Sequence, residues 1–156
     1  MAYSKELVSQ IGDFLKSAGI TAAFEEKDGN AFFSIRMKLR CKLQTAQMIL
    51  LVRQDNFATL TTLPLAADEN HRLAMAEFLT RVNWGLRNGN FEMSMNTGEI
   101  RYKTYVHTGA QPLDVSAARN AVLLPFLMID RFGDALLEVL FGFKSPREAF
   151  ESLSAK

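Results

Sequence analysis

Cysteine and histidine are scarce in this sequence of 156 residues, which holds one cysteine, Cys41, and two histidines, His71 and His107. A single cysteine excludes an internal disulfide, and Cys41 has no Cys or His neighbours at the spacing of a zinc site. The two histidines fall in different predicted elements, without a Cys, His or carboxylate partner at ligand spacing. We therefore predict no metal site and no other cofactor.

Motifs for catalysis or nucleotide binding are also missing. The serines are scattered without a Gly-x-Ser-x-Gly elbow, and Cys41 has no neighbouring base that would activate its thiol. The spacing of Gly85, Gly89 and Gly98 fits a helix end and a turn better than a phosphate cradle. We predict that the protein is not an enzyme. An undetected enzyme or small-ligand receptor stays the third hypothesis for its function.

The sequence has neither a strong charge of one sign nor a long apolar run. Eighteen basic and 17 acidic residues leave a formal net charge of +1, which removes the global electrostatic argument for nucleic acid or an anionic membrane. No apolar run approaches the roughly 20 residues that cross a bilayer. The first residues are amphipathic rather than a secretory signal. We predict a cytoplasmic protein with no membrane partner, folded as one domain over residues 1–156.

Apolar residues at helical spacing predict two helices in the first half of the chain. The first begins at an N-cap, Ser4, and ends before Gly19. The second begins at about Asp68, whose charge suits a helix N-terminus, and is expected to end at Gly89. The two apolar stripes consist of Leu7, Val8, Ile11, Phe14, Leu15 and Ala18, and of Met75, Phe78, Leu79, Val82 and Leu86.

Two further helices are predicted near the C-terminus. Residues 113–143 are the most apolar segment, and Pro125 within it predicts a kink or a break, because proline removes one backbone hydrogen bond. A capping box, Ser145-Pro146-Arg147-Glu148, starts a short last helix.

Alternating apolar and polar residues predict strands between the helices. Residues 20–26 and 31–39 flank the turn signal Asp28-Gly29, and residues 47–53 and 57–63 form a second hairpin that Pro64 ends. The clearest hairpin follows the second helix. Its strands are residues 91–95 and 100–106, joined by a turn at residues 96–98.

This order of elements predicts an α+β fold rather than an α/β fold. Short turns between successive strands imply an antiparallel β-sheet of about five to six strands, in the order α-β(3-4)-α-β2-α-α. Helices with one apolar stripe imply that they pack on one face of the sheet. The other face is then solvated or used for binding.

The segment LTRVNWGLRNGNFEMSMNTGEIRYKT, together with this order of elements, resembles the YbjN family of bacterial sensory transduction regulators. The most specific match is Asn83-Trp84-Gly85-Leu86 followed by Gly89-Asn90-Phe91. Phe24, Leu63-Pro64 and Leu140-Phe141-Gly142 fit more loosely, and the resemblance spans about residues 20–142. It implies the fold of type III secretion chaperones, which are dimeric, and a binding or regulatory role. Chaperone activity does not follow from a shared fold.

A basic ladder is the sharpest local feature. Arg36, Lys38, Arg40 and Lys42 alternate, so they project from one sheet face at about 6 to 7 Å intervals if the strand continues that far. With aromatic residues among the charges, this face would bind phosphates and stack bases, which is the nucleic-acid alternative. The simpler interpretation is the wet side of a half-buried sheet, and the charge near zero favours it.

Two more features have competing interpretations. Asp130, Asp134 and Glu138 follow one another at four-residue steps, which suits either a solvated helix face, the interpretation we favour, or paired carboxylates for a cation or acid–base work. Trp84 is expected to pack the helix onto the sheet, whereas an exposed Trp84 would be an anchor for a partner.

The sequence thus predicts a non-enzymatic intracellular module that binds an unidentified protein partner and forms a homodimer. The dimer is implied only by the resemblance to secretion chaperones, and nucleic acid is the less favoured partner. The candidate partner-binding residues are Arg36, Lys38, Arg40, Arg101, Lys103 and Tyr105.

Overall fold

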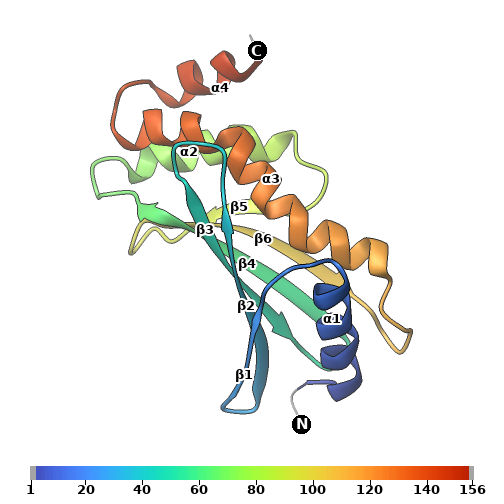
Figure 1. The fold of residues 1–156 in the computed structure, drawn as a ribbon. Helices are drawn as coiled ribbons and strands as arrows, with labels where there is room; N and C mark the ends of the chain where they lie inside the picture. Colours follow the sequence, from blue (N-terminus) through green and yellow to red (C-terminus); the bar gives the residue numbers. More distant parts are fainter. Residues whose placement is uncertain (1–2, 155–156) are drawn as a thin grey trace.

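Helices α1, α2 and α3 lie on one face of a six-stranded antiparallel sheet in the computed structural model, which describes residues 3–154, and α4 packs on α2 and α3 (Figure 1). The elements are α1 (Lys5–Ser17), β1 (Ala23–Lys27), β2 (Asn30–Lys38), β3 (Thr45–Val52), β4 (Asn56–Ala66), α2 (Arg72–Trp84), β5 (Asn90–Met93), β6 (Glu99–His107), α3 (Val115–Leu140) and α4 (Pro146–Ser154). The strands lie in the order β1-β2-β3-β4-β6-β5. The predicted α+β class and element order are confirmed, with four strands between α1 and α2.

Local signals place several of these elements where the sequence predicts them. The Ser4 side chain accepts a hydrogen bond from the Leu7 amide at 3.1 Å and so begins α1. Asp28 and Gly29 both have positive φ, 52° and 75°, which closes the tight hairpin between β1 and β2. In the capping box, the Ser145 amide donates to the Glu148 carboxylate at 2.9 Å, and the return bond is also present.

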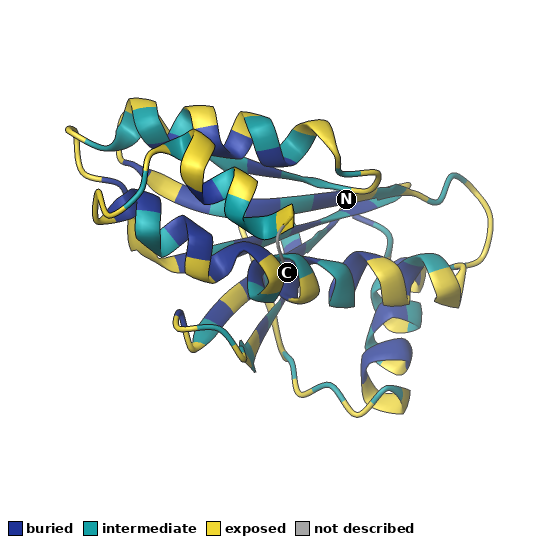
Figure 2. Cartoon of the chain, turned by 90° about the horizontal axis from the view of Figure 1, so that it is seen from above, coloured by how far each residue is buried: buried dark blue, intermediate teal, exposed yellow. Residues whose placement is uncertain are grey.

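The core lies between the sheet and the helices. Buried and paler bands alternate along the strands and the helices in Figure 2, as expected where each strand buries one face. On β2 the buried residues are Ala31, Phe33 and Ile35. On β6 they are Ile100, Tyr102 and Thr104. They belong to one face, and the apolar ones join side chains from all four helices in one buried cluster.

The second helix is shorter than the sequence predicts. Asp68 is not the first residue of the helix. It lies in a turn before the helix, where its carboxylate accepts hydrogen bonds from both the amide and the ring Nδ1 of His71. At the other end α2 stops at Trp84, five residues before Gly89. Gly89 has the left-handed φ of +71° that we expected, but it lies in the loop that enters β5.

Two strand ends also differ from the prediction. Pro64 does not end β4, which continues to Ala66 through a bulge between Thr62 and Ala66. Proline is accommodated there because neither neighbouring strand pairs with it at that position. The strand β5 ends at Met93, so Met95 lies outside it in the turn.

Pro125 does not break α3, which runs as one helix from Val115 to Leu140. A helix proline leaves the carbonyl four residues earlier without its donor. Here that carbonyl belongs to Ala121, and the hydroxyl of Thr104 donates to it at 3.0 Å. Thr59 lies 3.3 Å from the same carbonyl and 2.6 Å from the Thr104 hydroxyl. Two buried threonines on the sheet therefore replace the hydrogen bond that proline removes.

Candidate functional site

The sheet face opposite the helices is the candidate site, and we call it the uncovered face. The register of the strands places its side chains in rows across the sheet. One row contains Glu25, Phe32, Leu51, Ala58 and Tyr105. The next contains Ala23, Ser34, Ile49, Leu60, Lys103 and Asn90, and a third contains Arg36, Gln47, Thr62, Arg101 and Glu92.

Apolar side chains occupy the centre of the uncovered face. Together they form a second cluster, separate from the core, which consists of Phe32, Ile49, Leu51, Ala58 and Leu60. All five are only partly buried, because strand neighbours cover their flanks and no helix covers their ends. Tyr105, at the end of their row, is 60% exposed. The sequence offered a signal for this cluster: Met48 to Val52 is apolar at every position, which indicates a strand that is apolar on both faces.

The cations of the uncovered face differ in how they are paired. The side chain of Glu92 forms ion pairs with both Arg101, at 2.9 Å, and Lys103. Partial burial raises the pKa of Glu92, but the hydrogen bonds and charges of Lys103 and Arg101 outweigh it and hold this pKa below its usual value. Arg36 and Lys38 are exposed, and neither forms an ion pair within residues 3–154.

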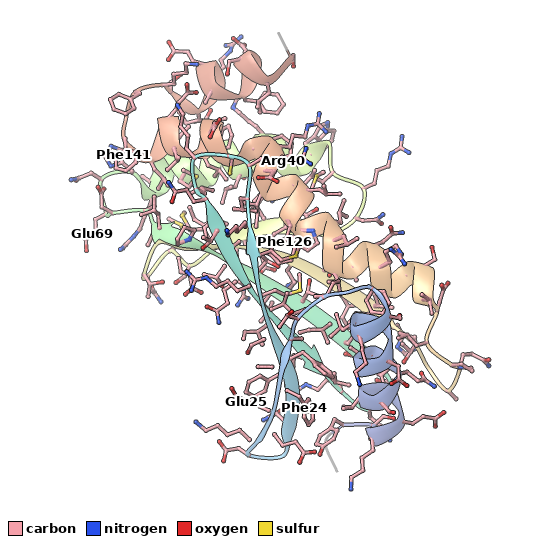
Figure 3. All side chains as sticks on the ribbon, viewed as in Figure 1. Phe24, Glu25, Arg40, Glu69, Phe126 and Phe141 are labelled. Atoms are coloured by element: carbon pink, nitrogen blue, oxygen red, sulfur yellow. The ribbon has the colours of Figure 1, made fainter. Side chains whose placement is uncertain are left out.

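The basic ladder is shorter than the sequence predicts, because β2 ends at Lys38. The chain then turns in a loop over residues 39–44, closed by a hydrogen bond between the Leu39 amide and the Gln44 carbonyl. Gln44 adopts a φ of 68°, which a strand does not allow. Arg40 and Lys42 therefore leave the row of Arg36 and Lys38. Figure 3 shows Arg40 beside α3, at the far end of the sheet from Phe24 and Glu25.

Two carboxylates on α3 hold this loop. Asp130 accepts hydrogen bonds from the amides of Arg40, at 2.6 Å, and Cys41, at 3.1 Å. Asp134 accepts from the amide of Lys42 at 2.8 Å. The favoured interpretation as a solvated helix face holds for Asp134, which is exposed, but it did not include the hydrogen bonds of Asp130 and Asp134 to this loop. Their partners are backbone amides about 90 residues away in the sequence, which no local pattern reveals.

Trp84 does not pack onto the sheet, since its side chain is 94% exposed. The buried residues of α2 are Met75, Phe78, Leu79 and Val82, and Trp84 falls two positions beyond Val82, on a different side of the helix. The neighbouring Asn83 connects α2 to the sheet instead. Its side-chain amide donates to the Phe91 carbonyl and accepts from the Phe91 amide.

The groups considered for catalysis or metal binding do not converge. His71 and Asp68 pair at 2.8 Å near the start of α2, whereas His107 and Asp55 lie 3.9 Å apart at the opposite end of β4. Burial raises the pKa of the Cys41 thiol, which disfavours a reactive thiolate. Within residues 3–154 no group of three or more His, Cys, Asp or Glu residues is placed to hold a metal ion. None of the helices in that part of the chain is long and apolar enough to cross a membrane.

Comparison with known proteins connects this structure to one family. The model of the family YbjN, described as "Putative bacterial sensory transduction regulator", matches residues 8–138. The match includes most of α1, all six strands, α2 and nearly all of α3. No curated protein matches the chain.

Proposed function

The chain belongs to the YbjN family, and on this premise we propose that it is a non-catalytic regulatory module that binds a protein partner through the uncovered face. One observation carries the proposal. The cluster of Phe32, Ile49, Leu51, Ala58 and Leu60 lies at the centre of a sheet face that no helix covers. Contiguous apolar surface that water still reaches, rimmed by polar residues, is typical of protein interaction sites.

The size of this face suits a short-lived contact. Neighbouring strands are about 4.8 Å apart and same-face residues about 6.8 Å apart, so three rows across five strands cover on the order of 500 Å². A standard stable interface buries about 800 Å² per partner, whereas transient signalling contacts bury less. The face alone therefore supports weak, reversible binding, which suits a regulator.

The charges at the rim favour an acidic partner. Arg36 and Lys38 stand at one end of the face without a carboxylate partner in the described chain. Exposed rim charges increase the rate of association and select the partner more than they increase affinity. The apolar centre is then the main source of binding free energy, and the cations orient the partner.

The homodimer implied by the resemblance to secretion chaperones stays a prediction. Under this proposal a second copy is one partner that the uncovered face would accept. Sedimentation equilibrium of the purified protein tests it.

The nucleic-acid alternative has less support than the protein partner. Arg40 and Lys42 lie outside the row of exposed cations, and Glu92 pairs with Arg101 and Lys103. Replacing Arg36, Lys38 and Arg40 with Glu should abolish any salt-sensitive retention on single-stranded nucleic acid. Absence of retention of the unmodified protein at low salt would exclude this alternative.

Affinity capture with matched variants tests the proposal. The tagged protein and its Leu51→Glu and Leu73→Glu variants are expressed in the source cells, and captured proteins are quantified by mass spectrometry. Leu73 is 77% exposed on α2, so it controls for an added charge elsewhere. We expect a captured protein, or a second copy of the chain, to be lost with Leu51→Glu and kept with Leu73→Glu. Identical capture by both variants would contradict the proposal.

A further inference from the structure

The free edges of the sheet include β1, residues 35–38 of β2 beyond β1, β5 and the second half of β6, and the first three are protected. The β2 stretch carries the exposed charges of Arg36 and Lys38. A free edge presents unpaired backbone groups that bind other strands unless the protein blocks it. The outer edge of β1 carries consecutive charges at Glu25, Glu26 and Lys27, which disfavour a further strand. The outer edge of β5 is blocked where the side-chain amide of Asn83 bonds to both backbone groups of Phe91, at 2.8 and 2.9 Å.

The remaining edge is the side of residues 104–107 of β6 that faces away from β4, and no strand within residues 3–154 pairs with that side. β5 pairs only with Ile100–Lys103, whereas β6 continues to His107. The chain leaves this edge at Gly89, where a Cβ atom would lie 2.6 Å from the Lys103 carbonyl oxygen. Residues 104–107, Thr-Tyr-Val-His, include no Asp, Glu, Lys or Pro to discourage pairing. We call residues 104–107 the open edge.

The register shows which backbone groups of the open edge are unpaired. Because the backbone groups of Phe91 bond to Asn83, they point away from β6. Antiparallel neighbours alternate between bonded and non-bonded pairs, so Asn90 and Lys103 are a bonded pair, and Lys103 directs its amide and carbonyl toward β5. Two residues further on, Tyr105 directs its amide and carbonyl to the same side, where β5 is absent.

A cavity of about 250 Å³ adjoins this edge, between β6, α3 and the loop before β5. Its lining includes Thr104, Val106, Ala117, Ala121, Leu124 and Asn88. The Tyr102 hydroxyl donates to the Asn88 carbonyl and fixes this wall. Burial raises the pKa of Tyr102 to about 12, so the hydroxyl remains a donor at neutral pH. The volume lies below the range of about 300–1,000 Å³ that is usual for small-molecule sites, and suits one or two side chains.

We propose that the open edge binds an extended segment of about four residues from a partner polypeptide, which adds a strand beside β6 in line with β5. The segment bonds to the amide and carbonyl of Tyr105, and a small apolar side chain enters the cavity beside Ala117 and Ala121. This is recognition by strand addition, in which the backbone supplies affinity and the cavity supplies specificity.

The charges around the open edge select the flanks of the segment. No acidic residue lines the cavity, and the sequence neighbours of its lining residues include Arg87 and Arg119. Both Arg87 and Arg119 are exposed. The segment therefore carries β-branched or small apolar residues in the middle and acidic residues beside them. This proposal does not rest on the uncovered face, because it uses a sheet edge and backbone hydrogen bonds.

A peptide experiment tests strand addition with the whole protein. Random heptapeptides displayed on phage are selected against the immobilised protein, and selected peptides are synthesised with a fluorescent label for anisotropy. We expect alternating β-branched sequences with acidic flanks. Ala117→Trp fills the cavity mouth and should weaken binding about tenfold or more. Ala76→Trp is the matched control, since Ala76 is half-buried on α2 outside the cavity, and it should bind normally. Asn120→Trp, at an exposed lining position, replaces Ala117→Trp if that variant does not fold.

Amide exchange by NMR identifies the edge directly. The Tyr105 amide should exchange fast in the free protein and at least about tenfold more slowly with the peptide, because a new hydrogen bond protects it. N-methylation of every second peptide amide should abolish binding, and methylation of the alternate set should not. The proposal is overturned if no peptide is selected, if the Tyr105 amide is unchanged, or if Leu51→Glu removes binding while Ala117→Trp does not. A dimer that Ala117→Trp converts to monomer would assign the open edge to a second copy and also overturn it.

Discussion

The two faces of the sheet differ at adjacent residues of the same strand. Leu50 is fully buried under the helices, and its neighbour Leu51 lies half-buried on the uncovered face. A leucine at position 50 therefore stabilises the fold, whereas a leucine at position 51 is available to a partner. The difference shows that covering by helices, rather than hydrophobicity, separates the structural face from the candidate binding face.

The largest expected effect is the loss of stability when the side chains of Leu50 and Leu51 are shortened in turn. Leu50→Ala should lower the free energy of unfolding by about 2 to 5 kcal/mol, because it removes a fully buried side chain and leaves a cavity. Leu51→Ala should lower it by about 1 kcal/mol or less, since water already reaches its side chain. Urea unfolding of both variants provides the measurement. Equal losses would mean that the two faces are not distinct.

A second variant tests why the basic ladder ends. A Cβ atom on Gly133 of α3 would lie 2.6 Å from the Cys41 sulfur and 3.0 Å from the end of the Leu43 side chain. Gly133→Ala should therefore displace the loop of residues 39–44 and destabilise the protein by about 1 to 3 kcal/mol. Combining it with Cys41→Ala removes the sulfur and should restore most of the loss in thermal unfolding. The absence of rescue would show that the loop does not pack on α3 at this point.

The threonines under Pro125 offer a third test, on the covered face. Replacing Thr59 and Thr104 together with Val keeps their shape and removes both hydroxyls from the Ala121 carbonyl. The loss should be about 1 to 3 kcal/mol, the cost of an unsatisfied buried acceptor. In a Pro125→Ala background the helix supplies its own donor, so the same pair of changes should cost less. A double-mutant cycle measures the difference, and a cycle without coupling would refute this account of the proline.

The smallest effect concerns pH and lies on the uncovered face. The pKa of Glu92 is lowered in the folded state from 4.5, so its ion pairs contribute stability above that pH, and this contribution is lost as the pH falls through the folded pKa. Glu92→Gln should therefore flatten the acid side of the stability profile. Chemical unfolding at a series of pH values below 5 measures this, with Glu77→Gln as the control for an exposed helix pair. Parallel profiles for the unmodified protein and Glu92→Gln would contradict the expectation.

Local periodicity was enough to predict much of the fold. The alternation in β2 and β6 and the cap at Ser4 involve neighbours in sequence, so they are visible without a structure. The end of the ladder was not predictable, because Asp130 binds the loop from a distant helix. The continuity of α3 at Pro125 depends likewise on hydroxyls from two distant strands.

The candidate site was predicted only in part. The strand register places Arg36 and Arg101 in one row of the uncovered face and Tyr105 two rows away. Arg40 lies outside this face, in the loop after β2. The apolar centre of that face was missed. The polar alternation in β2 drew attention to the charges, while the apolar residues of β3 were used only to predict a strand.

Site-specific crosslinking in living cells tests the central claim, that the uncovered face binds a protein partner. Benzoylphenylalanine is incorporated at Phe32, in the centre of the face, and separately at Leu73, an exposed position on α2. After irradiation, we predict a discrete crosslinked protein at Phe32 and none at Leu73. No crosslink at Phe32, or the same products at both positions, would contradict the claim.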